Sequence, residues 1–293
     1  MAPNIHIVTD STCDFSPGTT ADELEIAVVP LTVSIGEEFN GPETEISIEK
    51  FWDLVGKMRG KNKRATPKTS QPNPVAFEQV FSQLLKTEND KIICLTIADN
   101  LSGTYENAVQ AAKQFPENET TVIDSGTLSY GLGYLAEEAV REVKAGTSYK
   151  KIVRKLRVLK KRIDLVAVLD TVEFVIAGGR LAKLARVLDR MTKFVRIKAI
   201  IRINKGESFL FQTARTTSKA LEKVKRLIRE RANSPGLEKI SVIYTKGAEN
   251  PQEFANQLAE ELKREVPVIS TGAVLSCHGG PGVIGAVLVK KKT

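Results

Sequence analysis

The first half of the chain alternates short apolar segments with amphipathic helical segments, and this alternation narrows the possible folds more than any other feature. Strands are predicted over residues 5–8, 25–33, 91–97 and 120–123, and helices over 49–58, 74–86, 105–115 and 131–144. The helix at 74–86 carries apolar side chains at the i, i+3, i+4, i+7, i+8 spacing of one face: Phe77, Val80, Phe81, Leu84 and Leu85. Strands separated by helices pair in parallel, with helices on both faces of the sheet. The fold class predicted for this half is therefore an N-terminal α/β domain with a parallel sheet.

The second half follows a different pattern. Strands are predicted over residues 165–169, 195–203, 208–213, 240–244, 266–270 and 283–290, and helices over 218–232 and 251–264. Residues 204–207 (Asn-Lys-Gly-Glu) are typical of a hairpin turn. A hairpin plus helices predicts a C-terminal α+β domain with a mixed sheet. Because 293 residues favour two domains, we place them at 1–163 and 164–293, with the basic helix 149–162 as a candidate bridge.

Composition narrows the possible functions. No apolar run approaches the roughly 18 residues of a membrane span, and the N-terminus lacks the pattern of a signal peptide. We therefore expect a cytoplasmic protein without stable membrane insertion. The three cysteines are scattered, and His6 and His278 are the only histidines, so we expect no disulfide framework, no metal and no cofactor. The net charge of +8 raises the hypothesis of a nucleic-acid-binding regulator. No nucleic-acid-binding module is recognisable. An excess of basic residues also suits an acidic protein partner.

Short polar residues gather in loops after the predicted strands, where open α/β sheets place their ligands. These loops are residues 9–12, 66–72, 100–105, 124–127 and 276–282. Ser102 and Gly103 precede a helix, whose unpaired N–H groups and positive dipole end favour an anion. Gly103 permits close approach of the backbone, and Ser102 adds a hydroxyl donor. Thr69 and Ser70 precede another helix in the same way. Simple N-capping is the alternative explanation for both loops.

His278 lies among glycines, and a glycine-rich bend there would project its imidazole into a crevice. A purely structural histidine is the alternative. A serine hydrolase is a second functional hypothesis: one of the loop serines pairs with His278 as base, and Asp10 or Asp124 orients the ring. No serine lies in a G-x-S-x-G elbow, and no phosphate-binding glycine motif is present. The loops therefore favour an anion cradle, with a serine-type esterase or thioesterase as the alternative.

Six short motifs occur in a fixed order along the chain. They are Thr9-Asp10-Ser11, Lys68-Thr69-Ser70-Gln71-Pro72, Leu101-Ser102-Gly103-Thr104-Tyr105, Asp124-Ser125, Gly178-Gly179-Arg180 and His278-Gly279-Gly280-Pro281-Gly282. As an ordered set they resemble the signature of the DegV family over essentially the whole chain. The resemblance implies two α/β domains with a fatty acid buried between and within them. The N-terminal domain would carry the carboxylate-binding loops, and the C-terminal domain would house the acyl chain.

The resemblance also implies a role and a site. The chain would be a lipid-binding protein and not an enzyme, and it would present the carboxylate of a long-chain fatty acid to a separate fatty-acid kinase catalytic subunit. Thr69 and Ser102 would hold the carboxylate, with Ser70, Gly103 and His278 close by. Arg180 would lie at the pocket rim or face the partner.

Burial energetics are consistent with such a ligand. A saturated chain of about sixteen carbons, as in palmitate, gains about 0.8 kcal/mol per buried CH₂, on the order of 10 kcal/mol in total. Association costs of roughly 4–15 kcal/mol offset much of that gain. The buried carboxylate must therefore be well hydrogen-bonded, or its desolvation would cancel the remainder.

Overall fold

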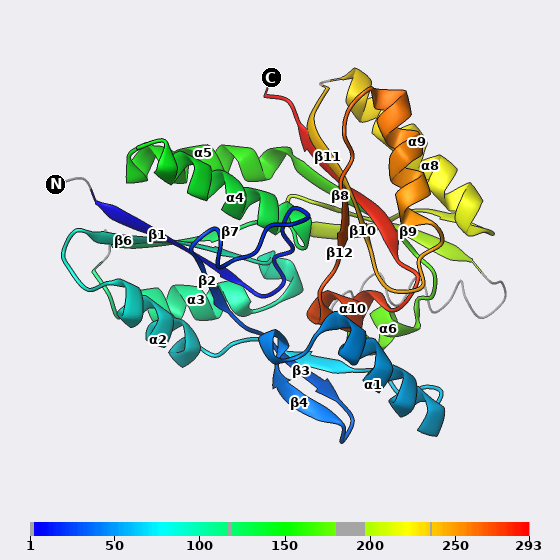
Figure 1. Cartoon of the computed structure of the whole chain (residues 1–293), viewed down its shortest axis with the longest axis horizontal. Helices are drawn as coiled ribbons and strands as arrows, with labels where there is room; N and C mark the ends of the chain where they lie inside the picture. Colours follow the sequence, from blue (N-terminus) through cyan, green and yellow to red (C-terminus); the bar gives the residue numbers. More distant parts are fainter. Residues whose placement is uncertain (1–2, 117–118, 180–196, 235, 293) are drawn as a thin grey trace.

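The computed structural model describes residues 3–116, 119–179, 197–234 and 236–292 (Figure 1). The first sheet has four strands, all parallel, in the order β2-β1-β6-β7. These strands are β1 (Asn4–Asp10), β2 (Ile26–Val29), β6 (Asp90–Thr96) and β7 (Thr120–Asp124). Helices α2 (Pro74–Leu84) and α3 (Thr104–Ala112) pack on one face, and α4 (Tyr130–Lys144) and α5 (Tyr149–Leu159) pack on the other. The predicted parallel α/β arrangement of the N-terminal half is confirmed.

The second sheet is mixed and has six strands in the order β10-β9-β8-β13-β11-β12. They are β8 (Ile163–Leu169), β9 (Lys198–Asn204), β10 (Glu207–Ala214), β11 (Leu237–Tyr244), β12 (Val268–Ser270) and β13 (Ile284–Lys290). Only β11 and β12 pair in parallel. Helices α8 (Thr217–Asn233) and α9 (Pro251–Leu262) cover one face. The predicted mixed sheet and its hairpin are confirmed: Lys205 and Gly206 both have positive φ, as a two-residue type I′ turn requires.

A small antiparallel sheet, which the sequence did not predict, joins the two larger ones. Its order is β4-β3-β5, from β3 (Thr32–Ile35), β4 (Phe39–Pro42) and β5 (Lys68–Ser70). Helices α1 (Ile48–Lys61) and α10 (Ala273–Gly279) pack against it, and the short α6 (Glu173–Gly178) lies beside α10 (Figure 1). This sheet brings Thr69 next to the C-terminal part of the chain.

The single strand predicted over 25–33 is wrong. The structure divides it into β2 and β3, which belong to different sheets. Pro30 lies between them and has no N–H to donate to a ladder. The chain therefore leaves the first sheet at this point.

The inner faces of the two larger sheets share one hydrophobic core. Its members come from the first sheet, from α4 and α5, and from the second sheet, and include Ile93, Leu135, Ile152, Leu165, Ile201 and Val287. All strands of the six-stranded sheet follow residue 162. The domain division at 163 and 164 stays a prediction. Within the described ranges, no helix combines the length and apolarity needed to cross a bilayer.

The loop after β1 packs closely on α4, and a glycine permits the contact. A Cβ on Gly133 would lie 1.8 Å from the backbone oxygen of Asp14. Backbone cannot rotate away as a side chain can, so this position requires glycine.

We predict that Gly133→Ala lowers the free energy of unfolding by about 3 kcal/mol, the upper end of overpacking costs. Gly56→Ala is the matched control: Gly56 is exposed on α1, and a Cβ there would meet no atom within 4 Å. That change should stabilise the helix by about 0.5–1 kcal/mol. Urea denaturation measures both values. Equal stability of Gly133→Ala and the unsubstituted protein would contradict the close contact.

Candidate functional site

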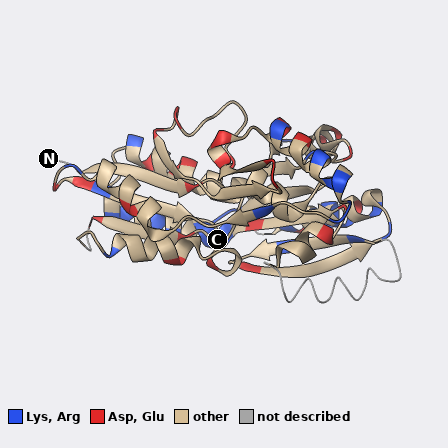
Figure 2. Cartoon of the chain, turned by 90° about the horizontal axis from the view of Figure 1, so that it is seen from below, with Lys and Arg blue, Asp and Glu red and all other residues tan. Residues whose placement is uncertain are grey.

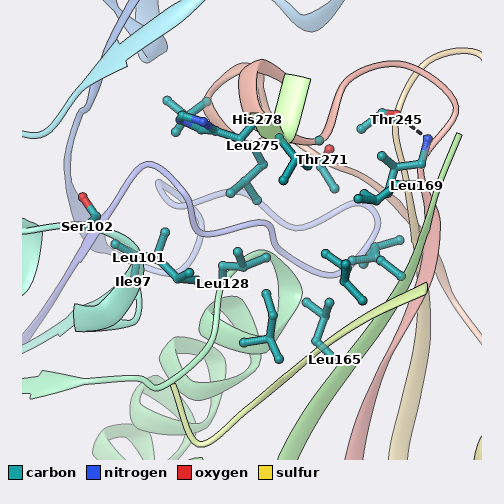
Figure 3. Close-up of a pocket in the computed structure, with 18 of the residues that line it drawn as sticks. Ile97, Leu101, Ser102, Leu128, Leu165, Leu169, Thr245, Thr271, Leu275 and His278 are labelled. Atoms are coloured by element: carbon teal, nitrogen blue, oxygen red, sulfur yellow. Dashed lines mark hydrogen bonds between the residues drawn. The ribbon is translucent and has the colours of Figure 1, made fainter. Parts of the chain in front are cut away.

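A pocket lies where the carboxyl ends of the parallel strands face the inner surface of the six-stranded sheet (Figure 3). Leu31, Ile97 and Leu128 follow β2, β6 and β7 and form one wall. The opposite wall comes from alternate residues of two strands: Leu165, Ala167 and Leu169 on β8, and Ile201 and Ile203 on β9. The empty space, including the open mouth, is about 890 Å³.

The described lining is almost entirely apolar and contains no Asp, Glu, Lys or Arg. Its polar side chains are Thr69, Ser102, Thr245, Thr271 and His278. Thr69 Oγ1 lies 2.8 Å from Nε2 of His278, within hydrogen-bond distance. Ser102 is 6% exposed, and its Oγ lies 2.8 Å from Oγ1 of Thr104. Hydroxyls and an imidazole are therefore the available partners for a polar ligand group.

Two hydrogen bonds connect the loop that follows Thr69 to the loop and helix that follow Ser102. The Gly103 N–H donates to Oε1 of Gln71 over 3.1 Å, and Nδ2 of Asn107 donates to the Pro72 oxygen over 2.8 Å. These bonds bring together two predicted site residues that lie 33 positions apart in the sequence.

Simple N-capping does not explain these two loops. Asn73 caps α2, and its side chain accepts the N–H of Ala76. Gly103 is the N-cap residue of α3 and makes no side-chain cap bond. Thr69 and Ser102 are therefore not needed to start either helix.

The structure separates two of the predicted ligand residues from the pocket. Thr69 and Ser70 are neighbours on β5, and successive side chains of a strand point to opposite faces. Ser70 is exposed, and neither Ser70 nor Gly103 lines the pocket. That Ser70 and Gly103 contact the ligand stays a prediction. Arg180 lies outside the described residues.

His278 lies in a helix, and the predicted glycine-rich bend is wrong. Residues 273–279 form α10, and His278 is in its last turn. Gly279 is the last residue of this helix, and Gly280 follows it: the Gly280 backbone N–H donates to the Ser276 oxygen, and Gly280 has a positive φ. The apolar run Ala273-Val274-Leu275 before His278 was the sequence signal for this helix.

Two carboxylates hold the start of α10. The Gly272 N–H donates to Oδ1 of Asp14 over 3.0 Å, and the Val274 N–H donates to Oε1 of Glu43 over 2.8 Å. Ser129 also donates to Asp14, over 2.6 Å. Burial raises the pKa of both carboxyls to about 7. No local sequence pattern marks Glu43, because its contact with α10 is made only in the folded chain.

The Gly178-Gly179 pair fits the packing of α6 against α10. A Cβ on Gly178 would lie 2.5 Å from Nδ1 of His278, so only glycine leaves room for the imidazole. Gly179 ends α6 with a φ of 64°, in the left-handed region. Gly178 of this motif therefore helps to position His278.

The aspartates considered as partners of His278 are engaged elsewhere. Asp10 is buried and accepts hydrogen bonds from the N–H groups of Thr12 and Ile97 over 2.9 and 2.7 Å. Asp124 accepts from the Gly126 N–H over 2.8 Å and pairs with Lys160 over 3.1 Å. Both residues hold the loops that line the pocket. Among the described residues, no group of three or more His, Cys, Asp and Glu side chains could hold a metal ion.

The chain resembles known proteins over nearly its whole length. The family model described as "Uncharacterised protein, DegV family" matches residues 4–291. A DegV domain-containing protein of Halalkalibacterium halodurans is 31% identical over 282 residues, which cover 96% of each chain. A structure described as fatty acid binding of a DegV family protein from Thermus thermophilus has a TM-score of 0.83 and 27% identity, and covers 98% of this chain and 100% of that one. The Streptococcus pneumoniae fatty acid kinase (Fak) B3 protein loaded with linoleic acid shares the fold, with a TM-score of 0.81, 19% identity and coverage of 98% and 100%.

We predict that Gly178→Ala displaces the imidazole of His278 and lengthens its contact with Thr69. NMR of the imidazole nitrogens measures this directly, because His6 is the only other histidine and serves as an internal reference. The His278 signals should shift while those of His6 stay in place. Gly60→Ala is the control, since a Cβ at Gly60 would meet nothing within 4 Å. Unchanged His278 signals in Gly178→Ala would refute the packing argument.

The carboxyls at α10 predict a pH dependence of stability. In the folded protein Asp14 and Glu43 keep their protons up to a pKa of about 7, whereas the ordinary values are 3.8 and 4.5. The folded state therefore binds more protons between about pH 4 and 7, and the free energy of unfolding falls as the pH rises through this window. Each group contributes a slope of up to about 1.4 kcal/mol per pH unit. In urea titrations from about pH 5 to 8, the double variant Asp14→Asn, Glu43→Gln should show a smaller slope; an unchanged slope would count against this assignment.

Proposed function

This chain belongs to the DegV family, and we propose that it binds one long-chain fatty acid in the pocket between its two larger sheets. The carboxylate lies at Thr69, Ser102 and His278, and the acyl chain runs along the apolar wall of β8 and β9. The Thermus thermophilus relative described as fatty acid binding supports this ligand class.

The observation that carries the proposal is the division of the pocket into a polar mouth and an apolar interior. Thr69 and His278 are half-buried and lie toward the surface, whereas Leu165, Ala167 and Ile201 are buried. A fatty acid has the same division, with one polar end and a long apolar chain. Burying about 14 CH₂ groups contributes on the order of 10 kcal/mol.

The chemistry of the mouth favours binding over catalysis. Neutral hydroxyls and an imidazole hydrogen-bond a carboxylate without the ion pair that a lysine or arginine would form. The Ser102 hydroxyl is bonded to Thr104, and Asp10 and Asp124 hold loops. A Ser-His-Asp arrangement, as the esterase alternative requires, is therefore not supported by these contacts.

The half-buried position of the carboxylate end also supports presentation to a second protein. We include in the proposal a separate kinase catalytic subunit that phosphorylates the bound carboxylate, as the family resemblance implies. A carboxylate at the mouth is within reach of such a partner, whereas one at the β8–β9 end would not be.

The nucleic-acid hypothesis gains no support from the charge distribution of the described residues. Basic and acidic residues are interspersed over the view in Figure 2, and several cations pair with acids, including Lys155 with Glu142 and Arg162 with Glu238. A nucleic-acid surface gathers unpaired Lys and Arg on one face.

The test is palmitate binding by delipidated protein, measured by isothermal titration calorimetry. The protein should bind one palmitate, and Ser102→Ala should weaken binding about 10- to 100-fold, as expected when a hydrogen bond to a charged group is lost. Ser70→Ala is the matched control, because Ser70 is exposed on the opposite face of β5, and it should leave the affinity unchanged. No binding to the unsubstituted protein would overturn the proposal. Binding without acyl-phosphate formation by an added fatty-acid kinase would reject only the presentation step.

A further inference from the structure

The apolar wall of the pocket stops where β8 runs under helix α4. Leu165 of β8 lines the pocket, whereas Ile163, two residues earlier on the same face of the strand, does not. Helix α4 covers Ile163 closely: a Cβ on Gly131, in the first turn of α4, would lie 3.2 Å from Cγ2 of Ile163. Ile163 is buried in the core that the two larger sheets share. The open space along β8 therefore ends at Leu165.

The hairpin between β9 and β10 closes the pocket beside Leu165. Ile203 of β9 lines the pocket and lies opposite Leu165 on the neighbouring strand. The hairpin turn that follows Ile203 is bonded to the loop of residues 125–129, because the Gly206 N–H donates to the Gly126 oxygen over 2.8 Å. The two backbones are so close that a Cβ on Gly126 would lie 3.2 Å from the Gly206 nitrogen. An acyl chain therefore has no exit between this turn and the loop.

The same loop, residues 125–129, supplies a third apolar side chain at this end of the pocket. Leu128 lines the pocket and is half-buried, so it keeps accessible surface that a ligand can contact. Leu128 and Leu165 lie on the side of the pocket away from His278 (Figure 3). Leu128 therefore faces the part of a ligand that is farthest from a carboxylate held at the mouth.

The backbone next to Leu128 is held in a strained conformation. Ser129 has a φ of 56° and a ψ of −141°, a combination that residues other than glycine rarely adopt. Two bonds hold Ser129 in place: its N–H donates to the Thr12 oxygen over 3.0 Å, and its hydroxyl donates to Oδ2 of Asp14 over 2.6 Å. Such strain persists only where the surroundings enforce it, and it gathers at functional sites. Leu128 is therefore anchored by the fold at the inner end of the pocket.

Resting on the proposed function, we propose that Leu128 is a specificity-determining residue that, with Leu165 and Ile203, sets the length of the acyl chain. The terminal methyl group of the ligand packs against these three side chains. A longer chain has to push its carboxylate away from Thr69 and Ser102 or displace the anchored loop. A shorter chain leaves empty apolar space at the inner end. The pocket therefore selects saturated fatty acids by length.

The experiment equilibrates delipidated protein with an equimolar excess of myristate, palmitate and stearate, and native mass spectrometry measures the ratio of the three complexes. Each additional buried CH₂ raises the affinity about 4-fold. Leu128→Ala opens the inner end of the pocket, so the ratio of stearate to palmitate complexes should rise about 5- to 15-fold over that of the unsubstituted protein. Leu128→Phe fills the same space, so the ratio of myristate to palmitate complexes should rise instead.

Leu275→Ala is the matched control, because Leu275 also lines the pocket and is half-buried but lies beside His278 (Figure 3). This change should weaken the binding of all three acids alike and leave their ratios unchanged. Unchanged ratios in both Leu128 variants, or the same shift in Leu275→Ala as in Leu128→Ala, overturn the assignment of Leu128. Absence of any complex with the unsubstituted protein refutes the proposed function itself, so the two failures are distinguishable.

Discussion

The site depends on how α10 is held between distant parts of the chain. At its start, Asp14 and Glu43 accept N–H groups from Gly272 and Val274, across 258 and 231 residues of sequence. At its end, His278 meets Thr69 of β5, across 209 residues. The first two bonds fix the start of α10. The third joins His278, in the last turn of α10, to Thr69. The small antiparallel sheet supplies Glu43 from just beyond β4 and Thr69 from β5, so this sheet aligns the two halves of the site.

The same arrangement explains why glycines recur around the site. Gly133 lets the loop carrying Asp14 approach α4, and Gly178 leaves room for the His278 imidazole. Both are close contacts that a single added carbon would prevent. The protein thus uses buried hydrogen bonds and close packing to keep a neutral, directional set of groups at the pocket mouth. In the function we propose, hydroxyls held in this way bind a carboxylate and leave its chemistry to another protein.

The sequence predicted the elements whose signal is local and repeated. The helix at 74–86 showed a full apolar stripe, and the strands of the parallel sheet were apolar runs between helices. The β3-β4-β5 sheet was missed because strands of three or four residues show too little alternation. Pro30 was the available sign that 25–33 is not one strand. At His278 the glycines that follow favour a bend, whereas the apolar run Ala273-Val274-Leu275 before it indicates the helix that the structure shows. Glu43 carries no local signal, since its role arises from a contact made only after folding.

The central claim is that a fatty acid lies in this pocket with its carboxylate at Thr69, Ser102 and His278. A crystal structure of the protein with palmitate measures this most directly. Carboxylate oxygens within about 3 Å of Thr69 Oγ1 and Ser102 Oγ, with the acyl chain along β8 and β9, are the predicted result. Palmitate in the reverse orientation, with its carboxylate beside Leu165 and Ile203, or bound outside the pocket, would contradict the account.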